Sequence, residues 1–249
     1  MRALIASSLA LSFAVTGCEA VDTGDFGAVL GEILEQPIGT STGGQDGLTT
    51  LEIDAALRQA LEIGTNRVAA QIGVTDGFWG DPQIQIPLPG RLGDVQGQLA
   101  QVGLSGPLDD LQLRMNRAAG PPVPAGKTIV IDAVKSITIN DAVGLLQGGD
   151  TAATDFLRGR TETSLRGLFK PYVEDGLNGS GAYRALDSVV SQTPLLALAA
   201  DDYKSDLTDH AVQLGLDGLF NYLAVEEKKI RENPVARTTD LLRKVFGSI

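Results

Sequence analysis

The sequence predicts a single all-α domain. Two apolar stripes recur at the spacing of one helix face, the first running from Ile53 to Ile72 and the second from Val212 to Ile230. Thr138 and Asp141 have the spacing of a capping box that opens a helix. Neither a strand–helix alternation nor an internal repeat is present. We therefore expect many helices around one core in residues 50–249, together with one extended, proline-rich loop.

Composition narrows the classes of function. The chain has 249 residues and a formal net charge of −11, so it lacks the basic surface that holds a phosphate backbone, and we expect no nucleic-acid partner. A single cysteine and a single histidine make a zinc site, an internal disulfide and a Cys/His catalytic pair improbable. We expect neither a metal nor a cofactor.

Residues 1–17 read as a lipoprotein signal peptide. Residues 3–15 form an apolar run that is too short to span a bilayer but typical of a signal sequence. The following Val15-Thr16-Gly17-Cys18 resembles the lipobox of bacterial lipoprotein precursors, in which the cysteine is lipidated and becomes the first mature residue. The alternative is an ordinary buried cysteine. Because Glu19 follows Cys18, the resemblance implies a periplasmic protein anchored to the outer membrane.

Residues 18–49 form the predicted lipidated N-terminus and tether. A short helix is expected from Phe26 to Leu34, ended by Pro37. Residues 39–47 contain only glycine and polar residues, which is typical of a flexible linker. The anchor should therefore hold the domain at the membrane without a spanning segment.

The domain itself is expected to begin with a long helix that stops at Gly73. The segment from Gly77 to Pro89 cannot be helical, because three prolines remove backbone donors and favour extended geometry in their predecessors. Asn233 followed by Pro234 is a strong helix start. The further helices are predicted at residues 91–102, 107–119, 127–136, 138–148, 162–177 (bent at Pro171), 181–191, 206–232 and 234–246.

Two segments carry polar residues that a helical pattern does not explain. Glu226 falls inside the apolar stripe of residues 206–232, where a carboxylate must be paired, hydrogen-bonded or protonated. Arg117 and Arg237 are its expected partners. Glu227 points to the side and is expected to form a surface pair with Arg231.

Asn116 lies in the middle of a predicted helix, where asparagine is unfavourable. It either caps a bend or hydrogen-bonds a specific group. These residues form the predicted polar cluster, which is either a functional site or a structural ion-pair network: Asn116, Arg117, Glu226, Glu227, Arg231 and Arg237.

Several co-linear stretches resemble a bacterial family catalogued only as a domain of unknown function, number 4197. They lie at residues 76–78, 86–89, 115–119, 138–142, 150–154, 218–220, 226–231, 234–242 and 245–246. The resemblance implies a periplasmic or lipid-anchored helical protein, without any assigned activity or catalytic residue. The chain departs from the pattern at residues 120–126, where a helix-compatible stretch with an acidic residue is expected.

Three functions stay open at this point. The preferred one is a lipid-anchored periplasmic module that binds an envelope partner or a small ligand. The second is a hydrolase that uses Glu226 or Glu227 with Asp109 or Asp110 as acid and base, which requires carboxylates that converge in one cleft. The third is a carrier of apolar ligands, with a cavity lined by Phe78, Trp79, Ile84 and Ile86.

Overall fold

The long helix α2 (Thr50–Ile72) opens the part of the chain that the structure, a computed structural model, describes: residues 47–192 and 203–248. A capping box starts this helix, since Glu52 N donates to Thr49 Oγ1 and Thr49 N donates to a Glu52 carboxylate oxygen. The helix ends before Gly73, as predicted. The other elements are α3 (Gly90–Ala100), α4 (Gly106–Ala119), α5 (Pro122–Lys135), α6 (Ile139–Leu146), α7 (Ala152–Gly179), α8 (Ala182–Gln192), α10 (Tyr203–Glu232), the 3₁₀ turn η1 (Pro234–Ala236) and α11 (Asp240–Phe246).

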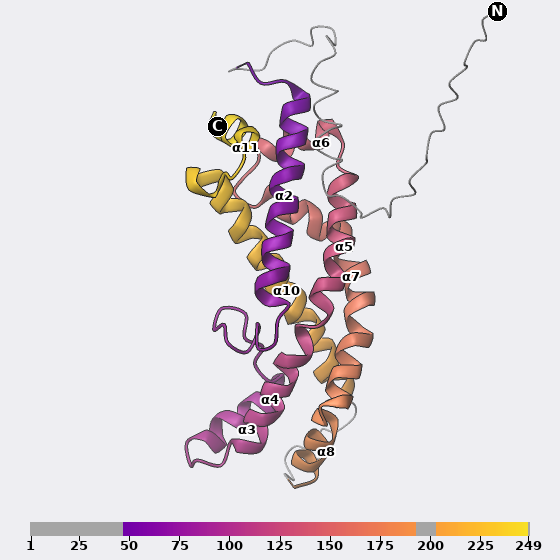
Figure 1. The fold of residues 1–249 in the computed structure, drawn as a ribbon. Coiled ribbons are helices and arrows are strands. Elements are labelled where there is room, and N and C mark those ends of the chain that lie inside the picture. Colours follow the sequence, from indigo (N-terminus) through magenta and orange to yellow (C-terminus); the bar gives the residue numbers. More distant parts are fainter. Residues whose placement is uncertain (1–46, 193–202, 249) are drawn as a thin grey trace, which may run out of the picture. The chain divides into compact units, whose positions relative to one another are not determined.

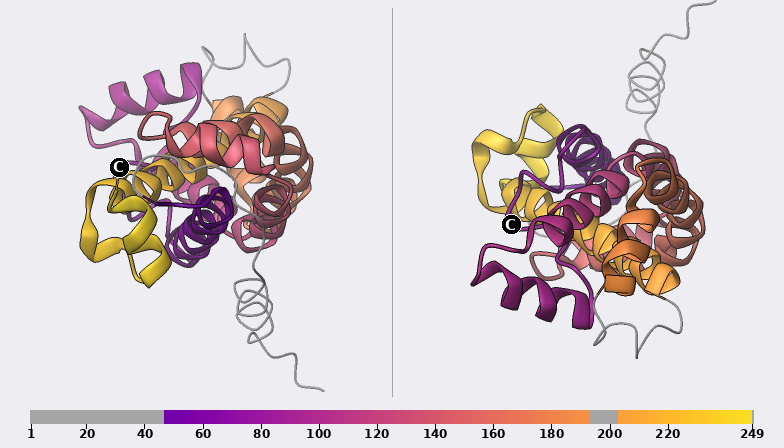
Figure 2. Two further views of the ribbon diagram at one scale, coloured as in Figure 1. Left: turned by 90° about the horizontal axis from the view of Figure 1, so that it is seen from above. Right: turned by 90° about the horizontal axis from the view of Figure 1, so that it is seen from below.

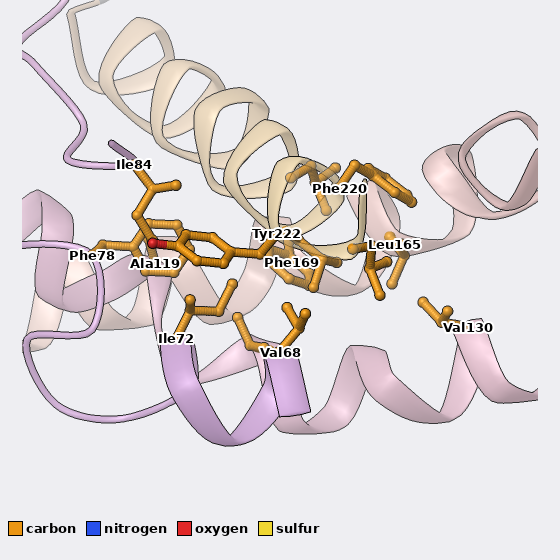
Figure 3. Packing of buried hydrophobic residues seen from close by; sticks show 14 of the residues in the cluster. Val68, Ile72, Phe78, Ile84, Ala119, Val130, Leu165, Phe169, Phe220 and Tyr222 are labelled. Atoms are coloured by element: carbon orange, nitrogen blue, oxygen red, sulfur yellow. The ribbon is translucent and has the colours of Figure 1, made fainter. Parts of the chain in front are cut away.

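Helix α10 runs through the middle of this all-helical domain. It packs against α2, α4 and α7, and α5 fills the space between α2 and α7 (Figures 1 and 2). The core residues come from all of these helices, and Figure 3 shows part of it, with Phe169 and Leu165 of α7 facing Val68 and Ile72 of α2. The prediction of one all-α domain is confirmed for the described residues.

The proline-rich loop packs onto the domain through residues 83–89, which leave a turn at 82–84 and run extended over 85–89, and which we call the extended segment. Its side chains alternate, because Ile84, Ile86 and Leu88 are buried whereas the residues between them are exposed. The close approach of this segment to α10 depends on Gly218, since a Cβ there would lie 3.0 Å from the Phe78 ring and 3.3 Å from Ile84. The predicted extended loop is confirmed for residues 85–89, whereas residues 75–80 and 82–84 form turns.

Three predicted helix bounds are wrong. Helix α5 begins at Pro122 instead of 127, because prolines in the first turn of a helix remove only N–H groups that have no intrahelical partner. Helix α7 begins at Ala152 instead of 162. The single helix predicted at 234–246 is η1 followed by α11, because Thr239 caps a new helix by accepting from Leu242 N.

The signal peptide, Cys18, the first predicted helix and the tether up to residue 46 lie outside the described residues. Within residues 47–192 and 203–248, no helix combines the length and the hydrophobicity that crossing a bilayer requires.

Replacing Gly218 with alanine should destabilise the protein. The new methyl group would push Phe78 and Ile84 away from α10, so we expect a loss of ~1–3 kcal/mol in the free energy of unfolding. Gly167 on α7 is the matched control, because a Cβ there meets no atom within 4 Å. Gly167→Ala should stabilise by up to ~1 kcal/mol. Urea denaturation of both variants checks this, and equal stabilities would contradict the close approach.

Candidate functional site

Glu227 on α10 caps the first turn of α7. One carboxylate oxygen accepts from Ala153 N at 3.1 Å, and the other accepts from both the Thr154 N and Thr154 Oγ1 atoms at 2.8 Å. Backbone N–H groups in the first turn of a helix have no intrahelical partner and attract negative charge. Glu227 is only 7% exposed, so the prediction that it lies on the surface is wrong.

Arg231 makes the corresponding contact at the end of α6. It donates to the carbonyl oxygens of Leu145 at 2.8 Å and Leu146 at 2.9 Å, while its Nη2 atom lies 2.8 Å from Glu227 Oε1. Cations are favourable at helix C-termini for the same reason that anions are at N-termini. One i,i+4 ion pair on α10 therefore joins the end of α6 to the start of α7. We call Glu227 and Arg231 the α6–α7 clamp.

Glu226 is buried, as predicted, but its partners differ from those expected. It accepts from Arg67 Nη1 of α2 at 3.2 Å and from Lys229 Nζ at 2.7 Å. Arg117 instead pairs with Asp76, and this contact lowers the pKa of the Asp76 carboxyl. Arg237 instead donates to the carbonyl oxygens of Ile230 and Arg231 at the end of α10.

Asn116 holds the extended segment in place. Its Oδ1 accepts from Ile86 N and its Nδ2 donates to Ile86 O, both at 2.8 Å, as a neighbouring strand would. Asn116 is 1% exposed, and its Nδ2 also donates to Gln112 O. Of the two predicted roles, hydrogen bonding to a specific group is therefore the one observed. The six residues of the predicted polar cluster do not meet at one point.

An open groove lies between the extended segment and α10. It has a volume of about 400 Å³, within the usual range for ligand sites. From α10 it is lined at helical spacing by Leu214, Asp217, Gly218 and Asn221, and from the extended segment by Gln83, Ile84, Gln85 and Pro87.

The groove is electrically close to neutral. Its one carboxylate, Asp217, bonds Arg158 of α7 and accepts from Gln213 Nε2 at 3.1 Å. The Gln85 amide donates to Trp79 O. The side-chain amides of Gln83 and Asn221 are exposed and make no hydrogen bond with any described residue. These amides are the groups best placed to accept and donate hydrogen bonds to a ligand.

Two contacts fasten the extended segment and its approach to α10. His210 Nε2 lies 2.9 Å from the carbonyl oxygen of Pro87. The Tyr222 hydroxyl donates to Asp81, and the carboxylate raises the pKa of Tyr222. Figure 3 shows Tyr222 lying between Ile84 and Ile72. The extended segment, which forms one wall of the groove, is therefore held at Pro87 and, just before its start, at Asp81.

Residues 47–247 match the family described as "Protein of unknown function (DUF4197)". The chain belongs to this family. No curated protein and no solved structure matches the chain.

The stretches that carry the DUF4197 resemblance gather at two places in the domain. The first is the α6–α7 clamp, where residues 150–154 meet residues 226–231. The second is the core beneath the groove, where the stretches around Phe78, Ile86, Asn116 and Gly218 contact one another, and of these stretches only Pro87 and Gly218 line the groove itself. The groove is the candidate functional site because it is open and carries side-chain amides without a partner among the described residues.

The carboxylates of the hydrolase hypothesis have separate structural partners. Asp109 accepts from Ser105 and Gln96, and Asp110 pairs with Arg114, so neither shares a partner with Glu226 or Glu227. Among the described residues, no three His, Cys, Asp or Glu side chains are grouped to hold a metal ion. The carboxylates that the hydrolase requires therefore do not converge.

Three of the four residues of the carrier hypothesis fill the core, whereas Trp79 is only partly buried. Phe78, Ile84 and Ile86 are buried and packed, and Figure 3 shows the first two against their neighbours. A separate cavity between α2, α10 and α11 has about 10 Å³ of free space, which is room for one water molecule. It is lined by Leu57, Ala60, Leu61, Gly64, Leu223, Glu227, Ile230, Arg231 and Phe246.

Sequence reasoning missed the partner of Glu226 and the polar residues of the groove. Arg67 and Glu226 are 159 positions apart, so no local pattern links them. Gln83 and Asn221 belong to no sequence motif that indicates a binding site. The alternation of Ile84, Ile86 and Leu88 with exposed residues was the one signal that could have predicted a packed segment with an outward polar edge.

Glu227→Ala should destabilise the protein much more than Glu226→Ala. The first change leaves Arg231 and two helix N–H groups without their buried partner, for an expected loss of ~3–5 kcal/mol. Glu226→Ala leaves two cations that are already partly solvated, so a loss of about 1 kcal/mol is expected. Thermal melts of the two variants measure the difference. A larger loss of stability for Glu226→Ala than for Glu227→Ala would contradict the clamp.

Proposed function

We propose that this DUF4197 protein is a lipid-anchored periplasmic module of the outer membrane that binds a small neutral ligand in the groove between residues 83–87 and α10. The anchor rests on the lipobox-like sequence that ends at Cys18. The domain would then stay at the envelope through its lipid, because an acidic protein is repelled by anionic head groups.

The groove carries the binding part of the proposal. Its polar edge consists of side-chain amides, its carboxylate is already paired, and its floor is apolar through Leu214, Ile84 and Pro87. An amide offers both donors and acceptors without charge. The ligand chemistry that fits is therefore a neutral molecule with amide groups and small apolar parts, such as a short peptide or an N-acetylated sugar.

This proposal favours a binding module over the two alternatives. A hydrolase needs a free acid and a free base at the site, but Asp217 is held by Arg158 and Gln213. A carrier needs an enclosed apolar volume, whereas this groove is open and has a polar edge.

Cys18→Ser should abolish lipid attachment. In cells fed radiolabelled palmitate, the native protein should carry the label and sediment with outer membranes, whereas the variant should be unlabelled. Glu19→Asp is the matched control, because it keeps the acyl acceptor and should change only the membrane to which the protein is sorted. Equal labelling of the Cys18→Ser protein would refute the anchor.

The groove can be tested by nuclear magnetic resonance on the mature chain with Cys18→Ser. Two probes are used, N-acetyl-trialanine amide and N,N′-diacetylchitobiose, so that peptide and sugar are distinguished. At least one should shift the amide signals of residues 83–88 and 214–221 selectively. Asn221→Leu should weaken the binding of that probe by ~10-fold or more, because the substitution leaves a polar group of the probe unpaired.

Asn140→Leu is the control for this titration, since Asn140 is exposed on α6 and does not line the groove. It should leave binding unchanged. If neither probe shifts the groove residues, or if both variants weaken binding equally, the groove is not the site for this ligand class.

A further inference from the structure

The turn between α3 and α4 exposes apolar side chains at one end of the domain. Val102 is 67% exposed and Leu104 is 64% exposed. Helix α3 contributes only Leu92 and Val95 to the buried set, and it stands out from the other helices in Figures 1 and 2. We define residues 98–107 as the α3–α4 tip.

Part of the tip's backbone is paired within the tip. The N–H groups of Val102 and Leu104 both donate to Leu99 O, and Gly103 N donates to Ala100 O. Gly103 has the positive φ (73°) that this helix-ending arrangement requires. Ser105 N, Gly106 N and the carbonyl oxygens of residues 101–104 have no partner among the described residues, so they need water or head groups. The tip is therefore suited to the interfacial layer of a bilayer and not to its hydrocarbon core.

Charge also distinguishes the tip from the rest of the protein. No ionisable side chain lies between Asp94 and Asp109, although the chain as a whole carries a formal charge of −11. Anionic head groups repel acidic surfaces, so this uncharged end can approach a bilayer at the least electrostatic cost. Gln98 and Gln101 are exposed beside Val102 and can face the head groups.

The length of chain before the domain allows such an approach from the same membrane. Between Cys18 and Gly47 the chain can extend by at most ~95 Å. Val102 lies at most ~75 Å from the start of α2, which is the combined length of α2 and α4 (~55 Å) plus the step from Ile72 to Gly120 and the four residues from Gly106 to Val102. A chain anchored at Cys18 can therefore place the tip on the bilayer that holds its lipid.

We infer that the α3–α4 tip inserts Val102 and Leu104 into the lipid surface, as a second and weaker membrane contact. It does not depend on the ligand groove, which lies on a different part of α10 and the extended segment. It fixes which end of the domain faces the bilayer.

The test uses the mature chain with Cys18→Ser, which removes both the lipid and the only thiol. Val102→Cys then allows attachment of an environment-sensitive fluorophore at the tip. With vesicles of phosphatidylethanolamine and phosphatidylglycerol, its emission should shift to the blue. Val235→Cys is the matched control, because Val235 is 87% exposed on η1, and its fluorophore should not respond.

A second measurement uses no fluorophore. Sedimentation with the same vesicles should be weakened ~10-fold or more by the pair Val102→Asp and Leu104→Asp, since apolar burial drives this binding. Val235→Asp should leave it unchanged. Three results would overturn the inference: equal responses at 102 and 235, no response at 102 in a protein with native circular dichroism, or a response that depends on protein concentration without vesicles. The last would assign the tip to self-association.

Discussion

The ion pair between Glu227 and Arg231 fixes the rotation of α10 about its axis. The carboxylate faces the positive end of α7 and the guanidinium faces the negative end of α6, so each charge meets the helix end of opposite sign. With α10 held in this rotation, Glu226 turns toward Arg67 of α2, and Gly218 turns toward Phe78. The groove at the other part of α10 uses the same rotation, which the buried apolar residues of α10 also favour.

The groove exists because a segment that cannot be helical lies against a helix that lacks a side chain at the contact. Prolines keep residues 85–89 extended after the turn at 82–84, and Asn116 replaces the strand partner that Ile86 would otherwise need. Gly218 lets Ile84 approach α10. The alternation of the segment then leaves Gln83 and Gln85 on the outside, next to Asn221.

Local patterns predicted most of the fold because the signals at Gly73, Thr138 and Asn233 act within a few residues. They failed where tertiary packing decides. A one-sided helical projection placed Glu227 on the surface, but α10 is covered by α2, α4 and α7, so more than one face is buried. The groove joins residues more than 120 positions apart, for which the sequence offers no local signal.

The clamp also bears on how the chain reaches its native state. The turn between α6 and α7 is completed by side chains that lie 73 to 86 positions later in the sequence. Until α10 is present, both helix ends stay uncapped, and closing so long a loop precedes any gain from the contacts. A nascent or truncated chain that ends before α10 should therefore hold α6 and α7 only as fluctuating, protease-sensitive helices.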